Sequence, residues 1–308
     1  MTKIVLMIHG VSQDLTKSQF MQYVDDVKWA VLERSPKLSD QVVFKGIYYA
    51  DLLQRPQDNL MAEMEKRPLG WLRIRRLLML HFSDAITLEH KAYADQSAYK
   101  RVQRLVAETI RRAYEEANDD DAEVVILANS LGAQIISNYL WDAQADIEAR
   151  FGDDESRMDL AAHVPTECIW NEPSRRLERG VLTENDAQVR LQKLRYFLTT
   201  GCNIPLFVSG LPRIQGVYRN RFGYNFKWDN YYNRNDILGW PLRPLGEFFD
   251  KNERGASYAD LVSNDVAFRL RGRWWFPFIN WTPLTHNYYW ESKQIIAALT
   301  KALEEVRP

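Results

Sequence analysis

Ser130 has the surroundings that most directly suggest chemistry. It follows an apolar run, Val124–Leu127, and stands in the pentapeptide Ala-Asn-Ser-Leu-Gly between Ala128 and Gly132. A serine nucleophile on a sharp strand-to-helix turn needs small residues at these two flanking positions. A serine that caps the N-terminus of a helix would give a similar local pattern. The pentapeptide by itself therefore leaves both interpretations open.

A serine hydroxyl becomes a strong nucleophile only beside a histidine base, which a carboxylate has to orient. His286 is the only histidine in the last third of the chain, and Asp236 ends a turn-like Asn-Arg-Asn-Asp sequence. Aspartate in such a turn is also a common capping residue. The competing carboxylates are Asp229, which lies inside a predicted strand, and Asp265, for which an exposed sheet edge is expected. We favour Asp236, because a side chain within a strand is hard to aim.

The elements that must position these residues alternate between strands and helices. Short apolar runs predict strands at 3–8, 42–49, 124–127, 194–199, 226–232 and 257–270. Helical spacing predicts helices at 17–35, 96–117, 131–141, 184–192 and 294–306. The alternation predicts an α/β fold with a mostly parallel central sheet, whose sites lie at the carboxyl ends of the strands. His9-Gly10, Ser130 and Asp236 each follow such a strand end.

The domain organisation follows from length and from the gaps in this pattern. The 308 residues are predicted to form a single α/β domain, 1–308. Two segments interrupt the alternation and are interpreted as helical insertions, a cap-like one at 51–95 and a second at 142–193.

Five segments resemble members of the α/β-hydrolase superfamily, and most closely its bacterial lipase-like and esterase-like hydrolases. They are IVLMIHG, VVILANSLGAQII, LRYFLTTGCNIPLF, WDNYYNRNDILGWPL and LTHNYYW. Together they span nearly the whole chain, and they place serine, aspartate and histidine in the order that this superfamily uses. The resemblance implies a three-layer sandwich around a mostly parallel sheet, carrying a serine hydrolase site with a nucleophile elbow.

The resemblance also implies a role for each residue of the catalytic triad. Ser130 would be the nucleophile, His286 the general base and later the general acid, and Asp236 the group that orients the imidazole. The backbone N–H of Leu131 would form one half of the oxyanion hole. The other half would come from the loop at Gly10, through the N–H of Val11.

The expected reaction is cleavage of a carboxylic ester through an acyl-enzyme intermediate, with no cofactor and no metal. The same triad would also serve a thioesterase or an amidase. Ala128, Asn129 and the turn 201–203 depart from the family pattern, and they motivate an alternative, a catalytically inactive α/β-hydrolase-like binding protein. His9 is expected to bond to backbone and shape its loop, and Cys202 to be a small buried filler.

Two further segments bear on what the protein binds. Residues 64–82 are basic and amphipathic, which fits a packed helix with its arginines reaching solvent, or a lid or weak contact with a membrane surface. The sequence RGRWWFPFINW, 271–281, leads into His286. It fits core packing or an aromatic wall beside the site, and the wall would favour a small ester with an apolar acyl or aryl group.

Charge and hydropathy exclude several other classes. The formal net charge is −1, so no overall basic character favours nucleic acid. No apolar run approaches the roughly 18 residues of a membrane span. The start, MTKIVLMIHG, is interpreted as a buried strand rather than a signal peptide, and the two cysteines form no C-x-x-C pair. A cytoplasmic enzyme is therefore expected, of unpredicted oligomeric state.

Overall fold

The computed structural model is an α/β protein built on a parallel sheet. It describes residues 1–11, 15–53, 62, 64, 97–151, 168–172, 183–211, 214, 216–219, 223–246, 249, 258–263, 286 and 289–305. The strands are β1 (Lys3–Ile8), β2 (Val42–Ile47), β3 (Glu123–Asn129), β4 (Leu194–Thr200), β5 (Lys227–Tyr232) and β6 (Tyr258–Val262). The α-helices are α1 (Lys17–Arg34), α4 (Ala98–Ala117), α5 (Leu131–Phe151), α7 (Glu184–Val189), α8 (Ile204–Val208) and α9 (Lys293–Glu305). Short 3₁₀ helices are η1 (Pro36–Leu38), η3 (Ile169–Asn171), η4 (Arg243–Leu245) and η8 (Tyr289–Glu291).

The six described strands form one sheet in the order β2-β1-β3-β4-β5-β6, and every neighbouring pair is parallel. The predicted α/β class and mostly parallel sheet are thereby confirmed. Most observed bounds lie within two residues of the predicted ones; the last predicted strand is shorter, because β6 ends at Val262 and 264–285 lie outside the described residues.

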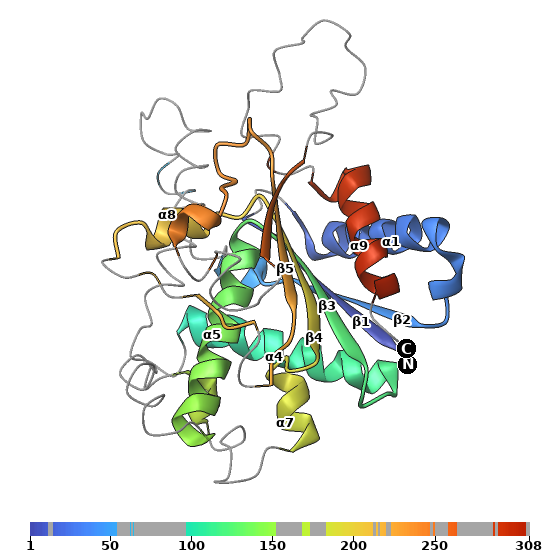
Figure 1. Ribbon diagram of the computed structural model, residues 1–308, viewed down its shortest axis with the longest axis horizontal. Helices are drawn as coiled ribbons and strands as arrows, with labels where there is room; N and C mark the ends of the chain where they lie inside the picture. Colours follow the sequence, from blue (N-terminus) through green and yellow to red (C-terminus); the bar gives the residue numbers. More distant parts are fainter. Residues whose placement is uncertain are drawn as a thin grey trace, which may run out of the picture.

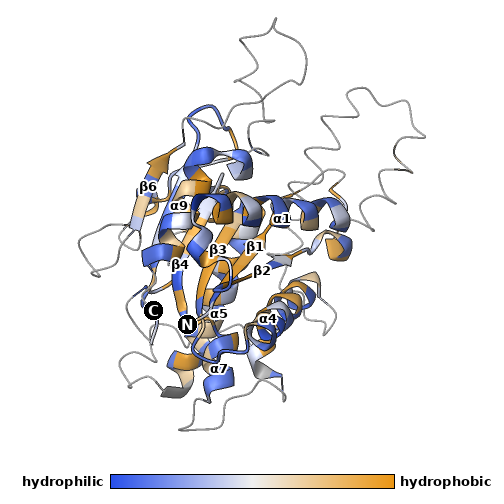
Figure 2. Ribbon diagram, turned by 90° about the vertical axis from the view of Figure 1, so that its right-hand side faces the viewer, coloured by the Kyte–Doolittle hydropathy of each residue, from blue (hydrophilic) through white to orange (hydrophobic). Residues whose placement is uncertain are grey.

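Helices cover both faces of the sheet, and alternate strand residues show why. In β1, Ile4, Leu6 and Ile8 belong to the core shared with α4 and α5. Val5 and Met7, which point the other way, pack in the core beneath α1 and α9. The two helix layers lie on opposite sides of the strands in Figure 1, and the apolar strands lie between them in Figure 2. A strand buried on both faces is continuously apolar, which is the pattern that the sequence carries.

Helix ends follow local capping chemistry. Thr16 caps α1 with φ −72° and ψ 157°, and its side chain and that of Gln19 bond reciprocally to backbone N–H groups. Helix α4 ends at Asn118, which takes the left-handed conformation with φ 48°. These caps are local in sequence, so the start of α1 and the end of α4 were predictable.

Helix α5 runs to Phe151, although the sequence predicted an end at Trp141 and an insertion from 142. The additional turns carry acidic residues that are buried rather than exposed. Asp142 accepts a hydrogen bond from Tyr99, and Asp146 pairs with Arg190 at 2.9 Å. The partners of these buried charges lie elsewhere in the chain, so the local sequence does not show that α5 continues here.

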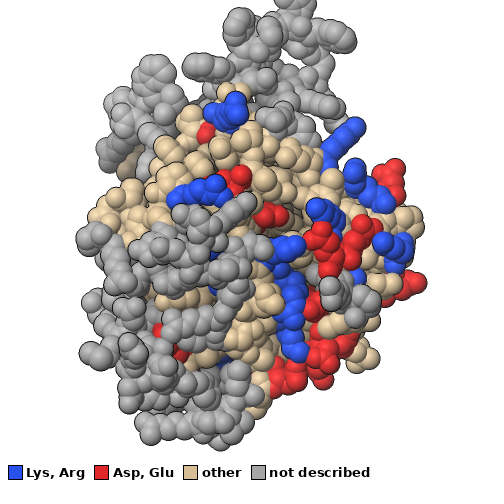
Figure 3. Space-filling model, viewed as in Figure 1, with Lys and Arg blue, Asp and Glu red and all other residues tan. Residues whose placement is uncertain are grey.

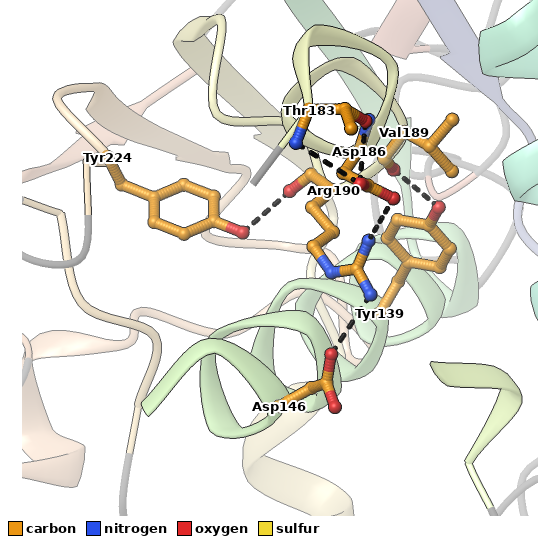
Figure 4. A network of polar contacts seen from close by, with 7 residues as sticks. All are labelled: Tyr139, Asp146, Thr183, Asp186, Val189, Arg190 and Tyr224. Atoms are coloured by element: carbon orange, nitrogen blue, oxygen red, sulfur yellow. Dashed lines mark hydrogen bonds and ion pairs between the residues drawn. The ribbon is translucent and has the colours of Figure 1, made fainter. Parts of the chain in front are cut away.

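Arg190 is the centre of that buried network (Figure 4). Its guanidinium contacts Asp146 of α5 and, at 3.3 Å, Asp186 of α7, and it lies 4.4 Å from the ring centroid of Trp170. Its backbone carbonyl accepts a hydrogen bond from Tyr224 at 2.6 Å. The network joins α5 and α7 to the turn that leads into β4.

Charges at the surface are mixed in sign. On the face seen in Figure 3, basic and acidic side chains lie beside one another. Along α4, Glu108 pairs with both Arg111 and Arg112, at 2.8 and 3.0 Å. No helix in the described part of the chain has the length and apolar character that a membrane span needs.

Several predicted features fall outside the described residues. They include most of the insertion 51–95, the basic segment 64–82 apart from Met64, and the aromatic segment 271–281. Within 142–193, the described parts belong to α5, η3, α7 and the approach to β4.

Candidate active site

The strand register brings the candidate residues to one edge of the sheet. Ile8 of β1 lies beside Ala128 of β3, and Thr200 of β4 lies beside Asn129. The chain segments that follow these strands therefore start next to each other. Ser130 leaves β3 between the ends of β1 and β4, which is the position that a parallel sheet offers for a functional site.

Ser130 occupies a sharp turn between β3 and α5. Its φ is +51°, a left-handed conformation that is rare for a residue with a side chain and costs about 1–3 kcal/mol. Its N–H still donates to the carbonyl of Thr200 at 2.9 Å. An ordinary N-cap has the extended geometry that Thr16 shows at the start of α1. The backbone of Ser130 therefore differs from that of a plain N-cap and matches the turn predicted for a nucleophile.

Gly132 shows why the turn needs a small residue after the serine. A Cβ atom added there would lie 2.6 Å from the carbonyl oxygen of His9 and 2.8 Å from that of Ile8. Both contacts are with backbone, which cannot move aside without disturbing β1. The missing side chain lets the first turn of α5 pack against the end of β1.

The structure brings Ser130, His286 and Asp236 together in one hydrogen-bonded chain. The Ser130 Oγ lies 2.6 Å from the His286 Nε2, and the His286 Nδ1 lies 2.8 Å from the Asp236 Oδ2. All three residues are buried. An ionised carboxylate only accepts hydrogen bonds, so the imidazole proton is on Nδ1. The lone pair of Nε2 then faces the serine hydroxyl, as a general base requires.

Asp236 is held by donors on both carboxylate oxygens. Its Oδ2 accepts from His286 and also from the Tyr289 hydroxyl at 2.7 Å, and its Oδ1 accepts from the Leu238 N–H at 2.9 Å. Burial acts to raise the pKa of Asp236, but these hydrogen bonds outweigh it, and the pKa lies below its ordinary value. The carboxylate is therefore ionised at neutral pH.

The turn after β4 forms a wall beside the histidine. Gly201 has φ +54°, and a Cβ atom there would lie 3.0 Å from the Nδ1 of His286 and 2.8 Å from the ring of Tyr289. The Gly-Cys-Asn sequence of this turn was a departure from the family pattern. Its glycine is required here both by the backbone conformation and by the close approach of the two rings.

The predicted oxyanion residues lie at the same edge. Leu131 is the first residue of α5, and first-turn N–H groups have no partner inside a helix. Gly10 packs directly against the serine, because a Cβ atom added to it would lie 2.6 Å from the Ser130 Cβ. Val11 follows it and is buried. That the N–H groups of Leu131 and Val11 receive an oxyanion stays a prediction.

His9 is bonded to backbone on both ring nitrogens. Its Nδ1 donates to the Gly10 carbonyl at 2.6 Å, its Nε2 accepts from the Tyr49 N–H, and its ring stacks on Tyr49 with centroids 4.3 Å apart. Burial lowers the pKa of His9 to about 4. These contacts confirm the expectation that His9 bonds to backbone, and its role in shaping the loop stays a prediction.

Of the competing residues, Asp229 and Cys202 are described, and neither belongs to the hydrogen-bonded chain of Ser130, His286 and Asp236. Asp229 lies within β5, as expected. Cys202 is buried, and burial raises the pKa of its thiol to about 12, so it is protonated at neutral pH. Asp265, His81, His90 and His163 lie outside the described residues. Among the described residues, no group of three or more histidine, cysteine, aspartate or glutamate side chains could hold a metal ion.

Tyr289 is the site residue that sequence reasoning missed. Its hydroxyl contacts Asp236, yet the sequence showed only an aromatic residue shortly after His286 in the segment LTHNYYW. A tyrosine near a candidate histidine is a weak signal, because aromatic residues are common in cores. Its hydrogen bond to Asp236 depends on the course of the chain after β5, which brings Asp236 beside Tyr289.

Comparison of the chain with models of known protein families and with curated proteins finds no match.

Proposed function

We propose that this protein is a serine hydrolase that cleaves a carboxylic ester through an acyl-enzyme intermediate. The observation that carries the proposal is the chain of contacts from the Ser130 Oγ to the His286 Nε2, 2.6 Å, and from the His286 Nδ1 to the Asp236 Oδ2, 2.8 Å. The left-handed backbone of Ser130 is independent support, because such strain in a non-glycine residue clusters at functional sites.

Acylation follows from this geometry. As the Ser130 Oγ attacks the ester carbonyl carbon, its proton passes to the His286 Nε2. The resulting imidazolium is stabilised by the ionised Asp236 carboxylate. The tetrahedral intermediate collapses when the bond to the alcohol oxygen breaks, and His286 returns the proton to that leaving oxygen. The alcohol departs, and the acyl group remains on Ser130.

Deacylation repeats these steps with water. His286 removes a proton from the water as it attacks the acyl carbon, and then returns a proton to the Ser130 Oγ as the acid is released. In both halves a negative charge develops on the former carbonyl oxygen. We assign its stabilisation to the N–H groups of Leu131 and Val11, each of which would contribute about 10²–10³ in rate.

The fold assignment is part of the same proposal. A parallel sheet with helices on both faces, a serine after β3 and an aspartate after β5 agree with an α/β-hydrolase fold. The departures at Ala128 and Asn129 do not alter the contacts of the triad. The inactive binding protein, which would be favoured by a Ser130–His286 separation above about 4 Å, is the less supported alternative.

The substrate class rests on sequence alone. The aromatic segment 271–281 leads into His286 and favours a small ester with an apolar acyl or aryl group. Thioesters and amides use the same triad chemistry and are the alternatives within this proposal. A contact of 64–82 with a membrane surface is a separate proposal, which liposome co-sedimentation with and without substitution of Arg73, Arg75 and Arg76 would test.

The test combines turnover with active-site labelling. The full chain is assayed against nitrophenyl esters of short and medium acyl chains, matched thioesters and amides, and a fluorophosphonate probe. We expect ester hydrolysis and a single phosphonylated peptide that contains Ser130. Ser130→Ala should abolish both, while Ser39→Ala, at an exposed serine of the surface, should leave both unchanged. Absence of hydrolysis and labelling in the unaltered protein would refute the proposal.

A further inference from the structure

Tyr289 makes two hydrogen bonds that join the candidate acid to the end of β5. Its hydroxyl donates to the Asp236 Oδ2 at 2.7 Å and accepts from the Asn233 N–H at 2.8 Å. The side chain is 1% exposed, so neither bond is shared with bulk water. A tyrosine hydroxyl has one proton to give, and here that proton goes to the carboxylate.

The Tyr289 hydroxyl donates to the same oxygen of Asp236 that accepts from the His286 ring. The Asp236 Oδ2 accepts from the His286 Nδ1 and from the Tyr289 hydroxyl, while the Oδ1 accepts from the Leu238 N–H. With donors on both oxygens, rotation of the carboxylate would break several bonds at once. The donor set therefore selects the orientation in which Oδ2 faces the imidazole.

We infer that Tyr289 is a positioning residue of the proposed triad. Its hydroxyl holds the Asp236 carboxylate toward the His286 Nδ1 and shares the negative charge on Oδ2. This role rests on the proposed hydrolase function and deepens it, because it acts through Asp236 and does not touch the substrate. Nothing in the spacing of the sequence assigns it.

Few other charged groups among the described residues act on the Asp236 carboxylate. Among the described residues, the titratable groups in contact with Asp236 are His286 and Tyr289. Three titratable groups lie on neighbouring elements. Cys202, which follows β4, is buried and protonated, and Arg234 is exposed. The carboxylate of Asp260 in β6 accepts from the Leu242 and Arg243 N–H groups, further along the loop. Removal of the Tyr289 hydroxyl should therefore change the titration of the Asp236–His286 pair directly.

The direction of that change follows from the hydrogen bond. The Tyr289 hydroxyl helps to hold the pKa of Asp236 below its ordinary value. Without this donor the carboxylate binds a proton more readily and attracts the imidazolium more strongly. Both effects favour the protonated pair, in which His286 cannot act as a base, so the acid limb of the pH–rate profile should move to higher pH.

The experiment measures the rate of Ser130 labelling by a fluorophosphonate between pH 4.5 and 9. Three proteins are compared with the unaltered chain: Tyr289→Phe, a variant with 3-fluorotyrosine at 289, and Tyr224→Phe. Tyr224 is the matched control, because its buried hydroxyl donates to the backbone carbonyl of Arg190 at 2.6 Å and takes no part in the triad. Thermal unfolding is recorded for all four proteins.

We expect Tyr289→Phe to label about ten-fold more slowly at pH 7, with its acid limb displaced upward by about half to one pH unit. Fluorotyrosine keeps the shape of the side chain and is a stronger donor, so its acid limb should move to lower pH. Tyr224→Phe should lose about as much thermal stability as Tyr289→Phe, but its pH–rate profile should not shift.

Unshifted profiles in both Tyr289 variants, or a shift in the same direction for both, would overturn the inference and leave the proposed function standing. If Tyr289→Phe does not fold, the inference depends on the fluorotyrosine protein alone, and an acid limb that does not move to lower pH would overturn it. Absence of Ser130-dependent labelling in the unaltered protein would instead overturn the proposed function, and this inference with it.

Discussion

The Nε2 of His286 lies 2.6 Å from the Oγ of Ser130, although the two residues are 156 positions apart in the chain. The parallel sheet makes this approach possible, because it places the ends of β1, β3, β4 and β5 along one edge. Asp236 follows β5 and contacts the far nitrogen of the same imidazole. Ser130, Gly132 and His9 lie at this edge, and Arg190 lies in a buried network at the opposite end of β4.

Replacing Ser130 should separate backbone strain from chemistry. Ser130→Ala and Ser130→Gly both lose the hydroxyl and should both abolish labelling. Glycine tolerates φ +51° without a Cβ penalty, so the Gly variant should be more stable than the Ala variant by about 1 kcal/mol. Urea unfolding measures the difference, and an Ala variant as stable as the Gly variant would argue against strain at this turn.

Gly132→Ala should disturb the elbow without touching any triad side chain. The new Cβ would meet the carbonyl oxygens of His9 and Ile8, so we expect a loss of about 2–3 kcal/mol and a marked fall in the labelling rate. Gly210 is the matched control, because a Cβ atom there meets nothing within 4 Å. Equal behaviour of Gly132→Ala and Gly210→Ala would contradict the close packing of α5 against β1.

His9 should make the stability of the protein depend on pH. Burial lowers its pKa to about 4, against an unfolded value near 6.5, so between these values only the unfolded state gains a proton. Stability is therefore lost as the pH falls through this window. From pH 7 to pH 5 the unaltered protein should lose about 2 kcal/mol more than His9→Gln. Urea unfolding at pH 7 and pH 5 measures the free energy of unfolding of both proteins. Equal losses in the two proteins would contradict a neutral, buried His9.

Arg190 should be important for stability and unimportant for the chemistry of the site. Arg190→Met removes the buried partner of Asp146, and we expect a loss of about 3 kcal/mol. Arg112 pairs with Glu108 on the exposed face of α4, so Arg112→Met should change stability little. Calorimetry compares the two variants, and a small loss for Arg190→Met would show that the network in Figure 4 contributes little to stability.

Much of the fold could be predicted because its signals are local. Apolar runs such as Lys3–Ile8 mark strands buried on both faces, and the capping residues at Thr16 and Asn118 mark helix ends within a few positions. The alternation of the elements then predicts a parallel sheet. Ser130, Asp236 and His286 could be selected as candidates because each follows a strand or lies in a late loop; their catalytic roles stay predictions.

The tertiary structure decided what depends on partners distant in sequence. Helix α5 continues past Trp141 because Tyr99 and Arg190 reach its acidic residues, which no local pattern shows. Tyr289 becomes a partner of Asp236 because the turn after β5, which carries Asp236, lies beside η8, which carries Tyr289. Residue types and order along the chain therefore determined the class of fold and the candidate nucleophile, base and acid. Burial and long-range hydrogen bonds determined which charges are paired, which histidine stays neutral and what holds the carboxylate in place.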